Sequence, residues 1–365
     1  GMLAARKQGC VCCGRPENKG QNDRGFWAIK HPTPNPDHRR NDLPTAIQSA
    51  IAALLAIGVS PQAGAQQIAS FNGPCDASAA VALDASHFVV GNDEHNTLLV
   101  YRQGQAAPVA SLNLANFLAT AADEESDIEG AAAIGTRIYW ITSHGRNSKG
   151  KARPGRQRFF ATDVVPGQPP TVKTVGQAYP DLLRDMLAAD TLRPYRLDEA
   201  ARRPPEADGG LNIEGLTATA DGKLLIGLRS PLPGQRALLI PLDNPAEVIA
   251  GQRARFGEPI ELDLGQRGIR SIERIGNGYL IVAGPTGDKG TFALFRWSGR
   301  RAEAPTPATG IDLKNLRPEA LFALPGSNRL QLLSDDGGVA IGGVECKTLP
   351  EAEQNFRSLT ITPGK

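Results

Sequence analysis

Several short motifs that mark common enzyme classes are missing from this 365-residue sequence. It contains no serine-nucleophile motif, no phosphate-binding P-loop, no glycine-rich dinucleotide turn and no zinc-ligand spacing. The usual signatures of serine hydrolases, P-loop nucleotide enzymes, Rossmann dehydrogenases and zinc proteins are therefore absent. Any function must depend on residues that the fold brings together from distant parts of the chain.

Long apolar runs are also missing. The apolar stretch LPTAIQSAIAALLAIGV at 43–59 contains two polar residues and is shorter than the ~20 residues of a membrane span. Two arginines precede it and AGA follows at 63–65, a pattern typical of a signal peptide. We therefore predict that residues 1–65 are a leader that is removed, and that residues 66–365 are exported, to the periplasm or outside the cell. A membrane anchor is the alternative.

An excess of positive charge is missing as well. The predicted leader holds 8 of the 40 Lys and Arg and 4 of the 38 Asp and Glu, which leaves 32 basic and 34 acidic residues, a net charge of −2 with His neutral. This balance gives no support to a nucleic-acid partner.

Cysteine is scarce. Three of the five cysteines lie in the leader, where the sequence CVCC matches no zinc pattern even with the nearby histidines. The other two are Cys75 and Cys346, near the two ends of the remaining chain. Two cysteines in an exported protein favour a disulfide, which would join the ends of the fold. Two unrelated buried thiols are the alternative.

Glycine and proline, in contrast, are abundant, with 40 and 28 residues and no collagen-like period, which predicts many tight turns. A similar stretch of 18 or 19 residues occurs five times, beginning at Ser78, Ile128, Ile213, Ile269 and Pro318. Each copy is typical of a β-hairpin, two apolar strands around a Gly or Asn turn, and further strand-like runs follow it. Four strands per ~50 residues, repeated along a chain, indicate a β-propeller.

We therefore predict an all-β fold, a β-propeller of five four-stranded blades built from residues 66–365 as a single domain. The segment 177–210 leaves room for a sixth blade, although its composition favours a short helix and an irregular loop. The strand QIASF at 67–71 is expected to join SLTITP at 358–363 in the last blade and so to close the ring. Closure would bring the two cysteines close together.

The motifs SDIEGAAAIGTRIYWITSHGRNSKGKARPGRQRFFATD, LNIEGLTATADGKLLIGLRSP and LRPEALFAL resemble those of a bacterial β-propeller family catalogued as domain of unknown function thirty-six sixteen. The resemblance covers essentially all of residues 66–365. More distantly, the IEGL hairpins are similar to those of the phytase-like esterase propellers, although no catalytic motif of that group matches residue by residue. The resemblance implies a propeller fold and no established activity.

Residues about 15 apart lie side by side at one edge of such a hairpin, so the copies should bring polar side chains to one face around the propeller axis. Five oxygen-bearing side chains are expected there: Asp127, Glu129, Asn212, Glu214 and Glu319. Carboxylate and amide oxygens that converge suit Ca²⁺ or Mg²⁺, so these residues are candidate metal ligands. Arg270 occupies the equivalent position in the fourth copy, and the alternative is a structural ring in which it pairs with the glutamates.

The loop 145–158 carries six basic residues and no acidic one. Because arginine forks make bidentate contacts to anions, this loop suits a phosphate, a carboxylate or a sulfated glycan. The candidate ligand contacts are Arg146, Lys149, Arg153, Arg156, Arg158, Arg229 and Arg270. A solvated loop without a ligand is the alternative. His144 is the candidate catalytic acid or base because the reference pKa of histidine is near neutrality.

Two functions are consistent with these residues. The first is an exported propeller that binds an anionic small molecule, a glycan or a partner at this face. The second is a hydrolase of phosphate esters or lactones that depends on Ca²⁺ or Mg²⁺, in which the metal polarises the bond and activates water.

Overall fold

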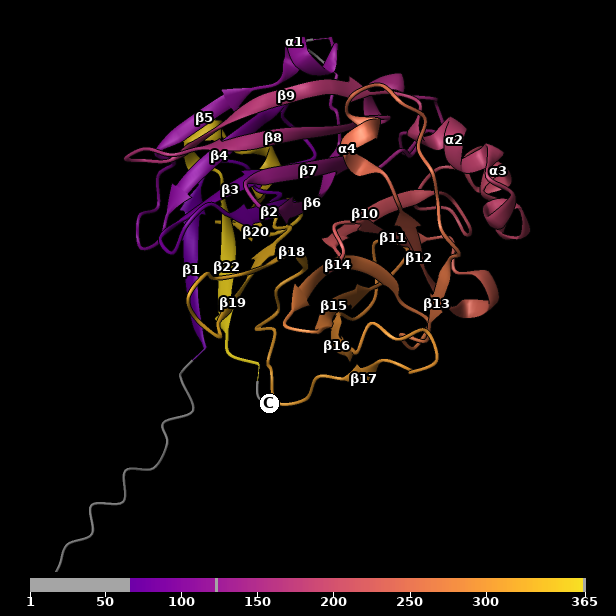
Figure 1. Cartoon of the computed structure of the whole chain (residues 1–365). Helices are drawn as coiled ribbons and strands as arrows, with labels where there is room; N and C mark the ends of the chain where they lie inside the picture. The colour runs from indigo at the N-terminus through magenta and orange to yellow at the C-terminus, as the bar shows by residue number, and fades with distance from the viewer. Residues whose placement is uncertain (1–65, 122–123, 364–365) are drawn as a thin grey trace, which may run out of the picture. The chain divides into compact units, whose positions relative to one another are not determined.

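The structure is a computed structural model that describes residues 66–121 and 124–363 (Figure 1). It confirms an all-β propeller. The predicted leader over residues 1–65 lies outside the described residues and stays a prediction. Among the residues that are described, no helix is both long enough and apolar enough to cross a membrane.

Five antiparallel sheets of four strands form the blades. The first blade comprises β2 (Ala79–Ala82), β3 (His87–Gly91), β4 (Thr97–Arg102) and β5 (Ala110–Asn113). The second comprises β6 (Ile128–Ile134), β7 (Arg137–Thr142), β8 (Phe159–Val165) and β9 (Thr171–Tyr179). The third comprises β10 (Asn212–Ala218), β11 (Leu224–Ser230), β12 (Ala237–Leu242) and β13 (Ile260–Leu262). The fourth comprises β14 (Gly268–Ile275), β15 (Gly278–Gly284), β16 (Ala293–Trp297) and β17 (Thr306–Pro307).

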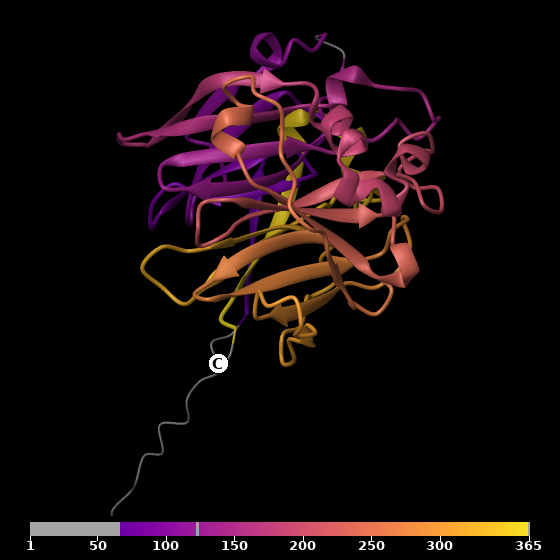
Figure 2. The same ribbon diagram turned by 45° about the vertical axis from the view of Figure 1, so that its right-hand side comes forward.

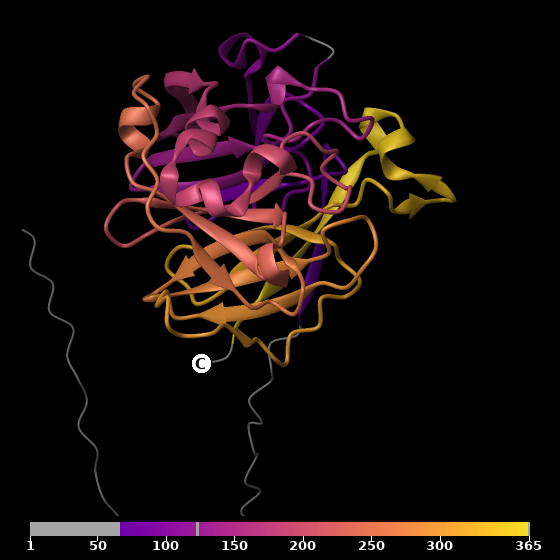
Figure 3. The same ribbon diagram turned by 90° about the vertical axis from the view of Figure 1, so that its right-hand side faces the viewer.

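The fifth blade contains both ends of the described chain. Its strand order is β18 (Pro318–Ala323), β19 (Leu330–Ser334), β22 (Asn355–Ile361) and β1 (Gln67–Asn72). The N-terminal β1 pairs antiparallel with the C-terminal β22, so the predicted ring closure is confirmed. Cys75 and Cys346 form the predicted disulfide, with 5.9 Å between their Cα atoms. Between β19 and β22, the short strands β20 (Ala340–Ile341) and β21 (Val344–Glu345) form a hairpin that projects from the body (Figure 3).

The first strand of each blade packs against the first strand of the next, which places β2, β6, β10, β14 and β18 around the axis. Figure 2 shows the strands of the first two blades above the orange strands of the fourth. Glycine permits this close approach, because a Cβ atom on Gly215 would lie 2.7 Å from Cγ2 of Ile269 in the neighbouring blade. The IEG sequence therefore includes a packing requirement as well as a carboxylate.

Apolar side chains fill the spaces between blades. The largest core cluster joins the second and third blades and includes Tyr139, Phe159 and Leu216. A second cluster at the ring closure packs Phe71 of β1 against Phe88 and Phe356, at ring-centroid distances of 5.2 and 5.5 Å. Burial of large aromatic side chains here stabilises the contact between the first and last blades.

Residues 180–211 contain no strand, so there is no sixth blade. Instead they form α2 (Leu182–Ala188), a 3₁₀ turn (Asp190–Tyr195) and α3 (Leu197–Ala200), as their composition indicated. Two short helices, α1 (Ala115–Leu118) and α4 (Pro245–Val248), lie in other connections. The insertion matters for function because its end, near Pro205 and Glu206, reaches the cavity described below.

Candidate functional site

In four of the five blades, the same position of the innermost strand is the unpaired residue of a β-bulge. The residues are Glu129, Glu214, Arg270 and Glu319. In each case the residues immediately before and after it pair with the neighbouring strand, while the residue itself has no partner in the register. A bulge redirects a side chain that regular pairing would fix, so these four side chains converge at one end of the axis.

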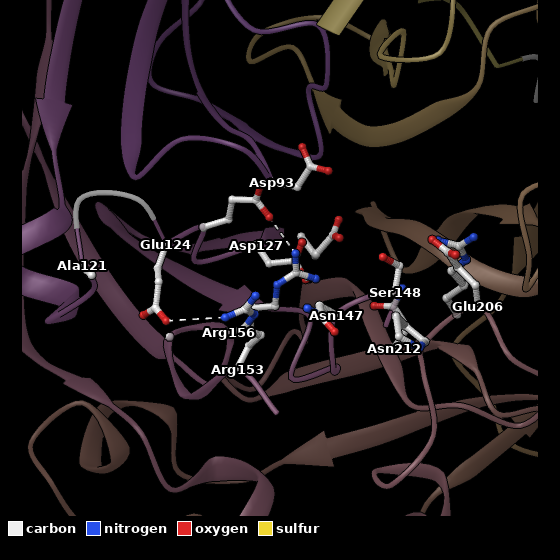
Figure 4. A pocket seen from close by; sticks show the side chains of 15 residues that line it. Asp93, Ala121, Glu124, Asp127, Asn147, Ser148, Arg153, Arg156, Glu206 and Asn212 are labelled. Carbon is white, nitrogen blue, oxygen red and sulfur yellow. Dashed lines mark hydrogen bonds and ion pairs between the residues drawn. The ribbon is translucent and has the colours of Figure 1, made fainter. Parts of the chain in front are cut away.

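Two adjoining cavities lie at this end, with volumes of about 590 and 530 Å³. They share four lining residues, Asp93, Glu129, Glu206 and Arg229, and we call them together the axial pocket. In Figure 4, Arg153 and Arg156 lie on one side of the first cavity and Asn212 and Glu206 on the other. The second cavity is lined by Glu214, Arg270 and Glu319 among others.

Arg270 connects two of the glutamates. Its side chain is buried, its Nε lies 2.6 Å from Glu214 Oε2, and its guanidinium also contacts Glu319. Arg229 donates a hydrogen bond of 2.9 Å to the other oxygen of Glu214. The sequence left open that Arg270 pairs with the glutamates in a structural ring. The structure shows this pairing for Glu214 and Glu319.

Glu129 is different, because no described residue forms a hydrogen bond or an ion pair with its carboxyl group. Its side chain is only 8% exposed. Burial raises the pKa of Glu129 well above its usual range, and the neighbouring carboxyl groups of Glu214 and Asp127 raise it further. Burial, together with Asp127, likewise raises the pKa of Asp93. Arg156 and Arg270 interact with Glu129 electrostatically, but neither forms a hydrogen bond or an ion pair with it.

Asn212 adds an acceptor beside them. It is 5% exposed, and its Nδ2 donates to Glu214 Oε1 over 3.3 Å. That contact leaves its Oδ1 buried and without a hydrogen-bond partner among the described residues. Asp127, in contrast, is engaged, because Arg156 donates to its Oδ2 over 3.0 Å.

The basic loop is largely occupied by contacts within the protein. Arg146 donates to the carbonyl of Ala201 over 2.9 Å, and Arg158 donates to the carbonyl of Leu118 over 2.8 Å. Arg156 also binds Glu125 at 2.7 Å, while Arg153 lies 3.9 Å from Glu124.

Lys149 is exposed, and it does not line the axial pocket. Of the five loop residues predicted to contact a ligand, only Arg153 and Arg156 line the pocket.

His144 lies outside the lining of the axial pocket. It is 2% exposed, and its Nδ1 lies 2.8 Å from the carbonyl oxygen of Thr142. Burial lowers the pKa of His144 to about 4, so the ring is neutral at pH 7. Its predicted catalytic role stays a prediction.

Asp93, Asp76 and Asp335 also line the axial pocket, although none of them was among the predicted ligand residues. A signal for Asp93 was present, because it follows Ser78 by 15 residues, the same separation as that between Glu214 and Arg229. Asp76 and Asp335 are brought together by an isolated bridge and by a hydrogen bond between their side chains. That pairing depends on ring closure.

The predicted metal ligands do not form a metal centre in this arrangement. Among residues 66–121 and 124–363, no group of three or more His, Cys, Asp or Glu side chains is placed to hold a metal ion. Glu214, Glu319 and Asp127 bind arginines instead. The predicted Ca²⁺ or Mg²⁺ site stays a prediction, and three of its five proposed ligands are already paired with arginines.

A protein-family model described as "Protein of unknown function (DUF3616)" matches residues 76–159 and 172–328. No curated protein matches the chain. Solved structures with a similar fold include Myxococcus xanthus glutaminyl cyclase, at 15% identity over 73% of this chain and 90% of that one, with a TM-score of 0.40. A putative oxidoreductase (glucose dehydrogenase) of Thermus thermophilus is 11% identical over 81% of this chain and 100% of that one, with a TM-score of 0.41. Similarities of this size say nothing about ligand or activity.

Proposed function

The chain belongs to the DUF3616 family of proteins of unknown function, and we propose that its β-propeller binds a cationic ligand in the axial pocket. The observation that carries this proposal is the carboxyl group of Glu129, which is 8% exposed and without a hydrogen bond or ion pair from any described residue. A buried charge without a partner is unfavourable, so burial in the empty pocket favours the protonated form of Glu129 and raises its pKa. A cation that enters supplies the missing partner and displaces that proton.

The surrounding groups suit an organic ammonium ion. Asn212 Oδ1 and Asp93 Oδ1 are buried acceptors without partners in the described part of the chain. An alkylammonium group has three N–H donors, and Asn212, Asp93 and Glu129, which all line the first cavity, are the acceptors proposed for them.

The balance of charge in the pocket also favours a cation. The first cavity is lined by six carboxyl groups and three arginines. The second cavity is lined by ten acidic residues and five basic ones.

The anionic ligand predicted from the basic loop has less support. Arg146 and Arg158 donate to backbone carbonyls, and Arg156, Arg229 and Arg270 bind carboxylates. A phosphate or sulfate would have to displace these partners and would meet the acidic lining. Binding of an anionic ligand therefore stays a prediction, which the titration described next also tests. The hydrolase alternative also stays a prediction, and it has less support because Glu214, Glu319 and Asp127 are paired with arginines.

The test is isothermal titration calorimetry of the full chain with n-butylammonium chloride, CaCl₂ and sodium phosphate as probes. We expect n-butylammonium to bind with release of up to about one proton, measured from the dependence of the heat on the ionisation enthalpy of the buffer. Because burial raises the pKa of Glu129 and protons compete with the ligand for its carboxyl group, affinity should rise with pH. Phosphate should bind more weakly than n-butylammonium.

Two variants make the result specific. Glu129→Gln keeps the shape of the side chain but removes the charge, and it should weaken n-butylammonium binding by about tenfold or more and abolish proton release. Glu258→Gln, at an exposed position outside the pocket, should bind as the native chain does. Unchanged binding by Glu129→Gln, in a variant whose unfolding transition is native-like, would overturn the proposal. Binding of phosphate without binding of n-butylammonium would also overturn it.

A further inference from the structure

A third cavity opens beside the axial pocket, with a volume of about 620 Å³. We call it the side groove. It lies between the end of β1, the loop after β3 and the approach to β6, and it shares Glu124 and Glu125 with the first cavity and Glu94 with the second. The three cavities therefore adjoin one another through shared carboxylates, and we call them together the trough. A trough of this kind suits an extended ligand better than a compact one.

The side groove has a distinct chemistry. Its described lining includes four glutamates, Glu94, Glu124, Glu125 and Glu351, and no Lys or Arg. Glu94 and Glu351 make no ion pair among the described residues.

An apolar wall runs beside these carboxylates, formed by Pro74, Leu99 and Ala115. Carboxylates next to an apolar wall match a methylene chain that ends in a cationic group.

We propose, in an inference that rests on the proposed function, that the ligand is an extended chain with at least two alkylammonium groups. The first ammonium binds at Glu129 in the axial pocket, where the unpartnered carboxyl and Asn212 Oδ1 are buried. The second binds at Glu94 and Glu351 in the side groove, with the intervening methylene groups along Leu99. The same chemistry occurs in a linear polyamine and in the lysine side chains of a peptide.

Two other classes of extended ligand fit less well. Neutral glycans commonly stack on aromatic side chains, but the described lining of the three cavities contains no Phe, Tyr or Trp. Anionic polymers would meet a lining in which acidic residues outnumber basic ones in each cavity.

The test compares ligands that differ in the number and the spacing of their ammonium groups, with the four-carbon diamine matched in length to n-butylammonium. The full chain is titrated with n-butylammonium, with α,ω-diamines of four to ten carbons, with spermine and with trilysine amide. We expect at least one multiply charged probe to bind about tenfold or more tightly than n-butylammonium, because the second contact becomes intramolecular. The order of spermine and trilysine amide distinguishes a polyamine from a lysine-containing peptide.

A matched pair of variants separates the groove from general electrostatic attraction. Glu351→Gln, at a position that lines the side groove but neither cavity of the axial pocket, should lose most of the gain but keep the affinity for n-butylammonium. Glu258→Gln removes the same charge from an exposed position outside the three cavities and should keep the gain. This inference is overturned if mono- and diammonium probes bind the native chain equally tightly, or if the groove variant keeps the gain in affinity. In either case, binding of n-butylammonium would still support the proposed function. If no ammonium probe binds the native chain, both proposals fail.

Discussion

Arg270 and Glu214 form a buried ion pair between the fourth and third blades, with 2.6 Å between Arg270 Nε and Glu214 Oε2. The same guanidinium contacts Glu319 of the fifth blade. One cation therefore connects three consecutive blades at the axis. Without it, Glu319 would lose its ion pair and Glu214 would keep only Arg229, so ring stability should depend strongly on this arginine.

Replacing Arg270 by Met should lower the free energy of unfolding by about 3–5 kcal/mol, because breaking a buried pair leaves uncompensated charge. The measurement is urea unfolding of the native chain and the variant at pH 7.5. The control is Arg300→Met, since Arg300 pairs only with Glu303 at the surface and its loss should not change the midpoint measurably. A loss below about 1 kcal/mol for Arg270→Met would show that the pair is not a structural connection.

Removing the disulfide should also destabilise the ring. Cys75 and Cys346 are separated by 271 positions, so the bond restricts a long loop in the unfolded chain. We expect Cys75→Ala/Cys346→Ala to lower the free energy of unfolding by about 4 kcal/mol, measured by guanidinium unfolding. Reduction of the native chain should give the same shift and leave the double variant unaffected. Equal stability of oxidised and reduced native chains would contradict this expectation.

His144 should make stability depend on pH. Burial lowers the pKa of His144 to about 4, whereas an unfolded histidine titrates near its ordinary value of about 6.5. Between these values only the unfolded chain binds the proton, so the free energy of unfolding falls as the pH decreases through this window, by at most ~1.4 kcal/mol per pH unit.

The experiment measures unfolding at pH 7 and pH 5 for the native chain and for His144→Gln. The variant should lose less stability between the two values than the native chain does. His95→Gln, which alters an exposed histidine, should behave like the native chain. If His144→Gln and native chains show the same slope, the burial of His144 does not influence acid unfolding.

Much of the fold was predictable because it depends on local pattern and repetition. The five hairpins appear in the sequence as apolar strands around Gly or Asn turns, and the structure places them as β2–β3, β6–β7, β10–β11, β14–β15 and β18–β19. Ring closure and the Cys75–Cys346 disulfide followed from the position of the first and last strands. The possible sixth blade was excluded only by the structure, although the composition of 177–210 already favoured a helix.

The site was less predictable, for two physical reasons. The bulges at Glu129, Glu214, Arg270 and Glu319 arise from strand register, which the partner strand decides. The partners of the arginines depend on side-chain direction between blades. The sequence could not show that Arg146 and Arg158 donate to backbone carbonyls while Glu129 remains without a partner.

The ring is closed in two places, and this has a thermodynamic consequence. β1 pairs with β22, and the disulfide joins Cys75 to Cys346 beside Asp76 and Lys347, which line the axial pocket. Part of the pocket wall therefore comes from both ends of the propeller and exists only while the ring is closed. Ligand binding and ring closure are linked equilibria: any molecule that requires this wall stabilises the closed ring by RT ln(1 + [L]/Kd).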